Sequence, residues 1–223
     1  MINVSLISLT LAYSIHHIPL FSLSSPMHFS LSNSHLTKIA HTVIISYHPS
    51  TIDLSHLLIQ NILTTFVTCI SLPESPDGST FTACVSNSNS QFSFANVDSF
   101  VVLNAVLSMD SCTFTSCSTR NVLLPIIDIQ NSQISMKKIT AKSCFYTFAQ
   151  ILSPTNQSYV TSSTFDDCYS SFSISNGNFQ FNSTTFTNYN KDHAANIQLE
   201  SCLTVFISEC SFDLSPEIFS ILA

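Results

Sequence analysis

The segments VTSSTFDDC (Val160–Cys168) and FNSTTFTNY (Phe181–Tyr189) share one pattern, in which an apolar residue stands five positions before a phenylalanine. Such five-residue steps occur five times between Met109 and Ser215, at Met109/Phe114, Ile134/Ile139, Val160/Phe165, Phe181/Phe186 and Ile207/Phe212. A polar residue precedes each second member: Thr113, Lys138, Thr164, Thr185 and Ser211. The second members are 25, 26, 21 and 26 residues apart, so this stretch is an internal repeat.

The repeat length predicts a solenoid with three short strands in each coil. A mean period of about 24.5 residues is longer than a hairpin and fits one solenoid coil. Apolar and polar residues alternate in short runs within a repeat, as in strands with one buried face. A five-residue step is odd, so a straight strand would send Phe181 and Phe186 to opposite faces. A corner at Asn182–Thr184 returns both rings to the interior, where like residues stack from coil to coil at about 4.8 Å.

The alternating pattern extends over most of the chain. Short apolar pairs begin near Leu20, as in Phe29/Leu31 and Val43/Ile45. We therefore predict an all-β parallel β-helix of about eight coils, formed by residues 20–223 as a single array. The breaker cluster Pro73–Gly78 predicts a protruding loop. The array stops after Phe212 without a recognisable cap, which is also what a fragment of a longer protein would show.

Residues 1–19 fit two roles. Met1–Leu23 carries no charged side chain, and Val4–Ala12 is an apolar run of signal-peptide length that leads into Ala12-Tyr13-Ser14. No Lys or Arg stands near Met1, and no stretch predicts a transmembrane helix. The same residues also fit the first strands of the array, so a signal peptide and a first strand both remain open.

The composition restricts the class of partner. Charged residues make up 9% of the chain, the formal net charge is −7, and Lys and Arg together number six. Nucleic acids and anionic membranes both require clustered cations, so neither is an expected partner. The polar surface must come from Ser, Thr and Asn, which suit strands and tight corners. With only two glycines, Asn is the residue expected at corners of positive φ.

The repeats resemble a known family. SMDSCTFTSC (Ser108–Cys117) and the two segments quoted above are similar to the right-handed parallel β-helix repeats of pectin-lyase-like proteins. More narrowly, they resemble the polymorphic outer-membrane protein type. The resemblance covers roughly Phe66–Phe212 and implies a secreted or surface-displayed rod, often adhesive. The chain lacks that family's glycine-rich tetrapeptide and has F-x-x-C in place of F-x-x-N.

Cysteines recur in an F-x-x-C motif, which we assign to the repeat: Phe66/Cys69, Phe81/Cys84, Phe114/Cys117 and Phe165/Cys168. Cysteines one coil apart, such as Cys144 and Cys168, could stack within disulfide range. We favour the alternative that they remain thiols and serve as small apolar core residues, because a solenoid of this size does not need disulfides. Eight cysteines permit full pairing in an oxidising compartment, so both alternatives stay open.

Residues with catalytic potential are scattered along the chain. Asp166-Asp167 is the only acidic pair, and on a strand neighbouring carboxylates point to opposite faces. The remaining candidates occupy other repeat positions: Arg120, Lys137-Lys138 and Asp192-His193. The histidines between His16 and His56 lack the tight spacing of zinc ligands and are expected to face solvent. We therefore assign no catalytic, cofactor-binding or metal-ligating residue.

We expect a non-enzymatic, secreted or cell-surface β-solenoid that acts as a structural or adhesive interaction module. Its expected partner is a carbohydrate or a host or cell-surface protein. The sequons Asn156-Gln157-Ser158 and Asn182-Ser183-Thr184 lie at predicted loops or corners, where glycans would be accessible.

Two alternatives compete with this interpretation. A polysaccharide lyase or glycoside hydrolase on the same scaffold would need grouped carboxylates around an acid/base pair. A leucine-rich repeat, whose period is also near 23 residues, would instead have one strand and a helical turn in each repeat.

Overall fold

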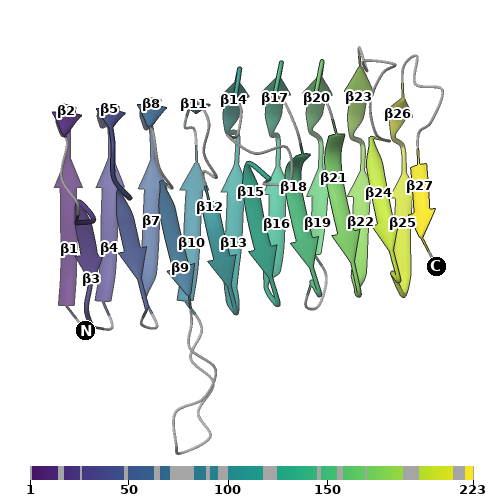
Figure 1. The fold of residues 1–223 in the computed structure, drawn as a ribbon, viewed down its shortest axis with the longest axis horizontal. Helices are drawn as coiled ribbons and strands as arrows, with labels where there is room; N and C mark the ends of the chain where they lie inside the picture. The colour runs from purple at the N-terminus through teal and green to yellow at the C-terminus, as the bar shows by residue number, and fades with distance from the viewer. Residues whose placement is uncertain are drawn as a thin grey trace, which may run out of the picture.

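The computed structural model shows a rod of stacked rungs (Figure 1). It describes residues 2–14, 18–25, 27–47, 50–62, 66–70, 83–88, 91–94, 100–117, 125–144, 147–154, 158–168, 170–187, 196–212 and 219–222.

Three parallel sheets run the length of the rod, and each has nine strands. Sheet A contains β1 (Ile2–Ile7), β4 (Met27–Ser32), β7 (Thr51–Ser55), β10 (Ala83–Ser88), β13 (Ala105–Asp110), β16 (Gln133–Lys137), β19 (Ser158–Thr161), β22 (Asn178–Asn182) and β25 (Thr204–Ser208). Sheet B contains β2 (Thr10–Ser14), β5 (His35–Ile39), β8 (Leu58–Ile62), β11 (Gln91–Phe94), β14 (Thr113–Thr115), β17 (Thr140–Lys142), β20 (Thr164–Asp166), β23 (Thr185–Thr187) and β26 (Ser211–Phe212). Sheet C contains β3 (Phe21–Leu23), β6 (Ile44–Ser46), β9 (Val67–Ile70), β12 (Phe100–Leu103), β15 (Ile127–Gln130), β18 (Thr147–Leu152), β21 (Ser170–Ser175), β24 (Ile197–Glu200) and β27 (Phe219–Leu222).

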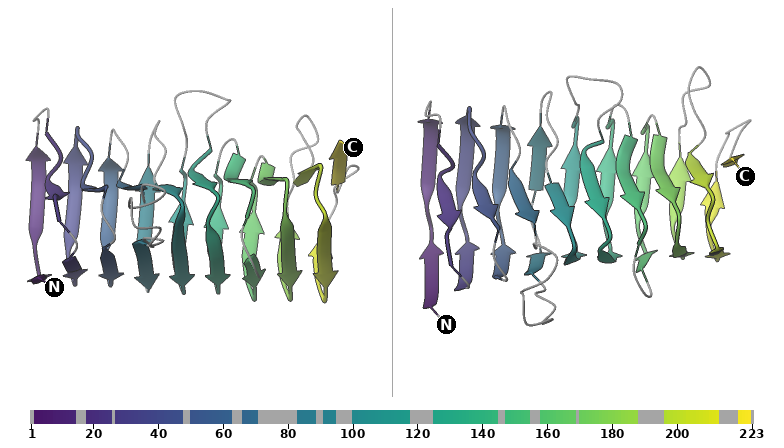
Figure 2. Two further views of the ribbon diagram at one scale, coloured as in Figure 1. Left: turned by 90° about the horizontal axis from the view of Figure 1, so that it is seen from below. Right: turned by 60° about the horizontal axis from the view of Figure 1, so that its bottom comes forward.

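The predicted parallel β-solenoid with three strands per coil is confirmed. Successive strands along the chain enter sheets A, B and C in turn, so each rung adds one strand to every sheet. The described residues form strands, bends and connections but no helix, which rules out the leucine-rich repeat. Figure 2 shows the rungs from two further sides, with the two termini at opposite ends of the rod.

The rod has one more rung than the eight coils expected. Strands β1 and β2 lie before Leu20 and pair with β4 and β5, so they form a first rung at the N-terminal end. The apolar side chains Val4, Leu6, Leu9 and Leu11 pack against the core from this rung. Cleavage of residues 1–19 as a signal peptide stays a prediction.

The corner predicted at Asn182–Thr184 is confirmed. Ser183 has a φ of 48°, and Phe181 and Phe186 on either side of it are both buried. The left-handed conformation is costly for a residue with a side chain. The N–H of Ser183 nevertheless donates to the carbonyl of Ser208 in the next rung at 3.0 Å, so the backbone ladder continues through the corner.

Residues of positive φ stand at corners between all three pairs of sheets. Among the described residues they are Ser8, Asn33, Lys38, His56, Asn104, Ser111, Ser116, Asn131, Lys138, Ser143, Ser153, Ser162, Asp167, Asn176, Ser183, Ser201 and Glu209. Asn was expected in this role, but Ser is the more frequent residue. At most of these corners the N–H of the positive-φ residue donates a hydrogen bond to a carbonyl of the next rung, which compensates for the weak intrinsic preference for this conformation.

The sixth rung differs from the expected alignment by two residues. Its apolar pair is Met136/Ala141, which aligns with Met109/Phe114, whereas Ile134/Ile139 was expected. Ile139 is instead the buried residue that follows the corner. The polar residue of this rung is correspondingly Thr140 rather than Lys138, because Thr140 pairs with both Thr113 and Thr164. Ala141 occupies the position at which the other rungs of this stretch have a phenylalanine. The sequence-based prediction placed the larger apolar residue Ile139 at this position instead.

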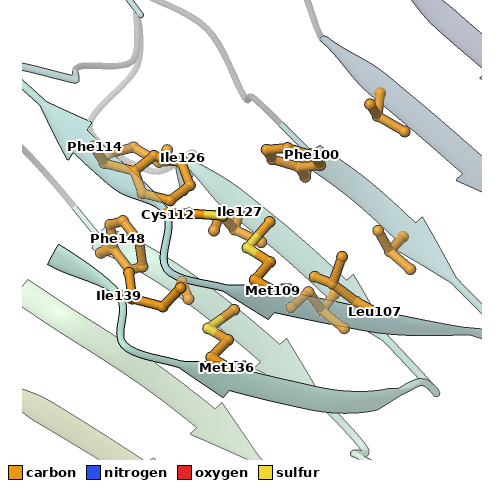
Figure 3. Close-up of a cluster of buried hydrophobic side chains, with 14 of the residues drawn as sticks. Phe100, Leu107, Met109, Cys112, Phe114, Ile126, Ile127, Met136, Ile139 and Phe148 are labelled. Carbon is orange, nitrogen blue, oxygen red and sulfur yellow. The ribbon is translucent and has the colours of Figure 1, made fainter. Parts of the chain in front are cut away.

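Phe148 fills the space that Ala141 leaves in the column of phenylalanine rings. Its ring centroid lies 5.1 Å from that of Phe114 and 5.2 Å from that of Phe165, both in edge-to-face contacts. Figure 3 shows the Phe148 ring beside that of Phe114. Farther along the rod, Phe186 and Phe212 continue the column with nearly parallel rings 4.9 Å apart. The core is therefore continuous although the sequence repeat is imperfect.

Buried serines after the corners accept hydrogen bonds from backbone N–H groups of the preceding rung. Ser163 Oγ accepts the N–H of Ile139 in the preceding rung at 3.0 Å and donates to the carbonyl of Thr161 at 2.9 Å. Ser34 and Ser132 make the same pair of contacts in other rungs. A buried donor without a partner is costly, so these serines belong to the architecture.

The histidines have more varied surroundings than expected. His28 Nε2 lies 2.6 Å from Asp53 Oδ2 on the outside of sheet A. His41 is only 6% exposed, so the expectation that the histidines face solvent is wrong for this residue. The predicted Pro73–Gly78 loop lies outside the described residues.

Candidate interaction surface

The outward side chains of sheet B form a strip, which we call the threonine strip. Side chains alternate across a strand, so Thr113 and Thr115 of β14 flank the buried Phe114 and project outward. The following four rungs repeat this arrangement. The strip comprises Thr113, Thr115, Thr140, Lys142, Thr164, Asp166, Thr185, Thr187 and Ser211.

The first column of the strip is made of hydroxyl residues in register. It runs through Thr113, Thr140, Thr164, Thr185 and Ser211, with consecutive members on adjacent strands. Neighbouring rungs are spaced at about 4.8 Å. Thr140, Thr164 and Ser211 are exposed, and the other two members are half-buried. Branching at Cβ restricts the threonine rotamers, so the hydroxyls form a row of fixed spacing. Figure 1 shows the strands that carry this row, β14, β17, β20, β23 and β26.

The second column contains a charged pair between rungs. Lys142 Nζ lies 3.7 Å from Asp166 Oδ2, and Thr187 Oγ1 donates to Asp166 Oδ1 at 3.0 Å. The Lys142 side chain is 63% exposed, so this ion pair adds little stability. Asp166 thus bridges three successive rungs on the outer face of sheet B.

Asp167, the second member of the acidic pair, lies in the corner with a φ of 53°. Its carboxylate accepts a hydrogen bond from Ser143 Oγ in the preceding rung at 2.9 Å. Asp166 and Asp167 therefore have different partners, one on the strand face and one at the corner. Asp166 is thus a strand residue whose side chain is only 23% exposed, and Asp167 alone is a corner residue.

A second polar row follows the corner between sheets A and B. Ser183 Oγ donates to Glu209 Oε2 at 2.8 Å, and Ser208 Oγ donates to Asn182 Oδ1 at 3.2 Å. The sequon Asn182-Ser183-Thr184 lies on this row. Asn182 is exposed while Thr184 is fully buried, so the asparagine side chain is on the accessible side of the corner.

Of the remaining candidates, the structure describes only Lys137 and Lys138. Lys137 ends β16, and Lys138 is the corner residue that follows it, with a φ of 52°. The other candidates lie outside the described residues: Arg120, Asn156, Asp192 and His193.

Only part of the F-x-x-C pattern belongs to the repeat. Cys117 and Cys168 occupy the same corner between sheets B and C, and Cys144 lies between them without a phenylalanine three residues earlier. Cys69 lies in β9 of sheet C and Cys84 in β10 of sheet A, so assigning all four motifs to one repeat position was wrong. The six cysteines whose side chains the structure describes are thiols: Cys112, Cys117, Cys144, Cys168, Cys202 and Cys210.

Asp128 was not identified from the sequence. It lies on the outer face of sheet C between Val101 and Gln150, and Gln130 Nε2 donates to its carboxylate at 3.4 Å. Burial raises the pKa of Asp128, and the hydrogen bond from Gln130 opposes this shift. A lone carboxylate in an alternating strand carries no sequence signal, because its burial depends on the neighbouring rungs.

The chain matches no family model, and no curated protein or solved structure is significantly similar to it. Within the described part of the chain there is no helix with the length and apolarity needed to cross a membrane.

Proposed function

We propose that this protein is a non-enzymatic, extracellular or cell-surface interaction module whose threonine strip binds neutral carbohydrate. The supporting observation is the column of registered hydroxyl groups on sheet B, from Thr113 to Ser211. Hydroxyls both donate and accept hydrogen bonds, as the hydroxyls of a sugar do. A polymer lying along this part of the rod would meet a hydroxyl group on each of the five rungs from β14 to β26.

The rigidity of the strip favours binding. Thr side chains on paired strands lose little rotamer freedom when a ligand arrives, whereas long side chains lose more. A row of weak hydrogen bonds can therefore add up along an extended partner.

The charge favours neutral over acidic carbohydrate. The chain carries a formal net charge of −7, and Lys142 is the only cation among the nine members of the strip, where Asp166 lies 3.7 Å away. An acidic polysaccharide needs unopposed cations. The exposed sequon at Asn182 supports an extracellular location.

An array of immobilised neutral and acidic glycans tests the proposal. Wild-type protein is compared with a Thr164→Val/Thr185→Val double variant, which removes two hydroxyls from the centre of the strip and keeps the side-chain shape. The matched control is Thr51→Val/Thr68→Val, which alters half-buried positions on sheets A and C. We expect wild type and control to bind neutral glycans, and the strip variant to bind at least about tenfold more weakly, since each lost hydrogen bond is worth about 1 kcal/mol.

Other outcomes would overturn the proposal. Equal binding by the strip variant would place the site elsewhere. Binding to cells that survives glycan removal but not protease treatment would indicate a protein partner. Release of reducing ends from acidic polysaccharides, abolished by Asp167→Ala, would establish the enzymatic alternative.

A further inference from the structure

Three cysteines stack at one corner of the rod. Cys117, Cys144 and Cys168 each follow the positive-φ residue that ends a sheet B strand, in three successive rungs. The strands before them are paired residue by residue, so the cysteines occupy equivalent positions. Cys117 and Cys144 are 0% exposed and Cys168 is 2% exposed. This cysteine ladder lies inside the core, on the inner side of the corner that carries Asp167.

The thiols of the cysteine ladder contact one another. The side chain of Cys144 interacts with those of both Cys117 and Cys168, and these interactions shift its pKa. Each of the two later sulfurs also reaches a backbone carbonyl of the preceding rung: Cys144 Sγ lies 3.9 Å from the Phe114 oxygen, and Cys168 Sγ lies 3.7 Å from the Ala141 oxygen. The central sulfur therefore has a thiol neighbour on each side.

Rung spacing determines which pairs can be bridged. Equivalent Cα atoms in adjacent rungs are about 4.8 Å apart, within the range of about 4.4–6.8 Å that a disulfide requires. Cys117 and Cys168 are two rungs apart, which gives about 9.6 Å and excludes a direct bond. Two adjacent pairs can thus form, and both contain Cys144.

We propose that the cysteine ladder is an oxidation site that forms a single disulfide, with Cys144 bonded to either Cys117 or Cys168 and the third cysteine left as a thiol. The oxidant is a small-molecule disulfide such as oxidised glutathione. The Cys144 thiolate attacks one glutathione sulfur and releases one glutathione thiolate. The neighbouring cysteine, after losing its proton, attacks the Cys144 sulfur of the mixed disulfide and releases the second glutathione. Two protein thiols are oxidised, and one glutathione disulfide is reduced to two glutathione thiols.

The directions of the pKa shifts indicate that the Cys144 thiol ionises before the Cys168 thiol. Hydrogen bonds from Cys117 and Cys168 lower the pKa of Cys144, although burial acts in the opposite direction. The hydrogen bond with Cys144 raises the pKa of Cys168, and burial adds to this. The thiolate is the attacking species in exchange, so Cys144 is the first sulfur to react.

The disulfide would join adjacent rungs that are close in space but separated in sequence by 27 or 24 residues. Closing a loop of this size restricts the unfolded chain. We expect oxidation to raise the midpoint of thermal unfolding by roughly 5–10 °C, and dithiothreitol to reverse the change.

Peptide mapping by mass spectrometry under non-reducing conditions tests the proposal. The reduced chain is incubated with oxidised glutathione, both folded and during refolding from urea, so that burial does not limit access. We expect a disulfide in wild type, in Cys117→Ala and in Cys168→Ala, but none among these cysteines in Cys144→Ala. Circular dichroism confirms that each variant is folded, and Cys144→Ser provides a second variant if Cys144→Ala is not.

Two results would overturn the proposal. One is the absence of any disulfide among these three cysteines in oxidised, folded wild type. The other is a Cys117–Cys168 bond in the Cys144 variants, which the rung spacing forbids.

Discussion

At the scale of single residues, the rod depends on side chains that the sequence shows only as a polar background. A serine directly after a corner looks like any other of the many serines, yet Ser163 is buried and joins two rungs through its hydroxyl. Its role could not be predicted, because the N–H that it accepts belongs to Ile139, 24 residues earlier.

Replacing this serine tests that role. Ser163→Ala should lower the free energy of unfolding by about 1–3 kcal/mol, because the N–H of Ile139 would remain buried without its partner. Urea denaturation measures the change. Thr164→Ser, an exposed position in the same rung, should change stability by less than about 0.5 kcal/mol. Equal effects of the two substitutions would contradict the assignment.

A residue-scale prediction also follows from Asp128. Burial raises the pKa of Asp128, so the folded protein binds the proton of this carboxyl group more tightly than the unfolded chain does. The contribution of Asp128 to the free energy of unfolding is therefore lost as the pH rises through its folded-state pKa. Asp128→Asn should therefore raise the thermal midpoint at pH 7 and leave it unchanged at pH 3, below the ordinary value of 3.8. Thermal scans at the two pH values measure this. A variant that is less stable than wild type at pH 7 would show that the charged form is favoured.

At the scale of elements, the strands and one corner could be predicted from the sequence because the alternation of buried and exposed residues along a strand is a local property. The odd step from Phe181 to Phe186 requires a turn wherever both rings are buried. The sixth rung was misaligned because its column residue is Ala141, and the missing ring is supplied by Phe148 from the next sheet. Such compensation between sheets depends on three-dimensional packing and leaves no periodic signal.

Truncating the compensating ring tests this interpretation. Phe148→Ala should cost about 3–5 kcal/mol, since it opens a cavity beside Ala141 that the neighbouring rings cannot fill. The control is Phe206→Ala on β25, where the side chain is 62% exposed and the change should be within about 0.5 kcal/mol. Chemical denaturation distinguishes the two. A small effect of Phe148→Ala would mean that the core is not packed as described.

At the scale of the whole molecule, the rod is a one-dimensional stack with exposed apolar side chains in its first and last rungs. Ile2 and Ile7 are exposed in β1, and Leu203 and Phe206 are exposed at β25. Both strands are the outermost members of sheet A, and an unpaired strand edge next to apolar side chains promotes association.

Association of this chain should therefore depend on its end rungs. We expect Leu203→Ser/Phe206→Thr to remain monomeric in analytical ultracentrifugation at concentrations where wild type self-associates. Tyr47→Ser, which removes an exposed apolar side chain away from the outermost strands, should behave as wild type. Identical sedimentation of all three proteins would show that the end rungs are not adhesive.

The threonine strip and the cysteine ladder both depend on the register of the rungs, in which equivalent residues of neighbouring rungs are paired. Thr10, Thr140 and Ser211 occupy one outward column of sheet B, on its first, sixth and ninth strands. All three are exposed. Spin labels can be attached there through ketone-bearing amino acids, which leaves the native cysteines untouched.

Pulsed electron paramagnetic resonance then measures the spacing directly. The backbone separation between Thr10 and Thr140 should be about 24 Å and that between Thr10 and Ser211 about 38 Å, because each rung adds about 4.8 Å. Label distances in the ratio of five to eight would support the account. Distances that do not grow with the number of rungs between the labels would contradict it.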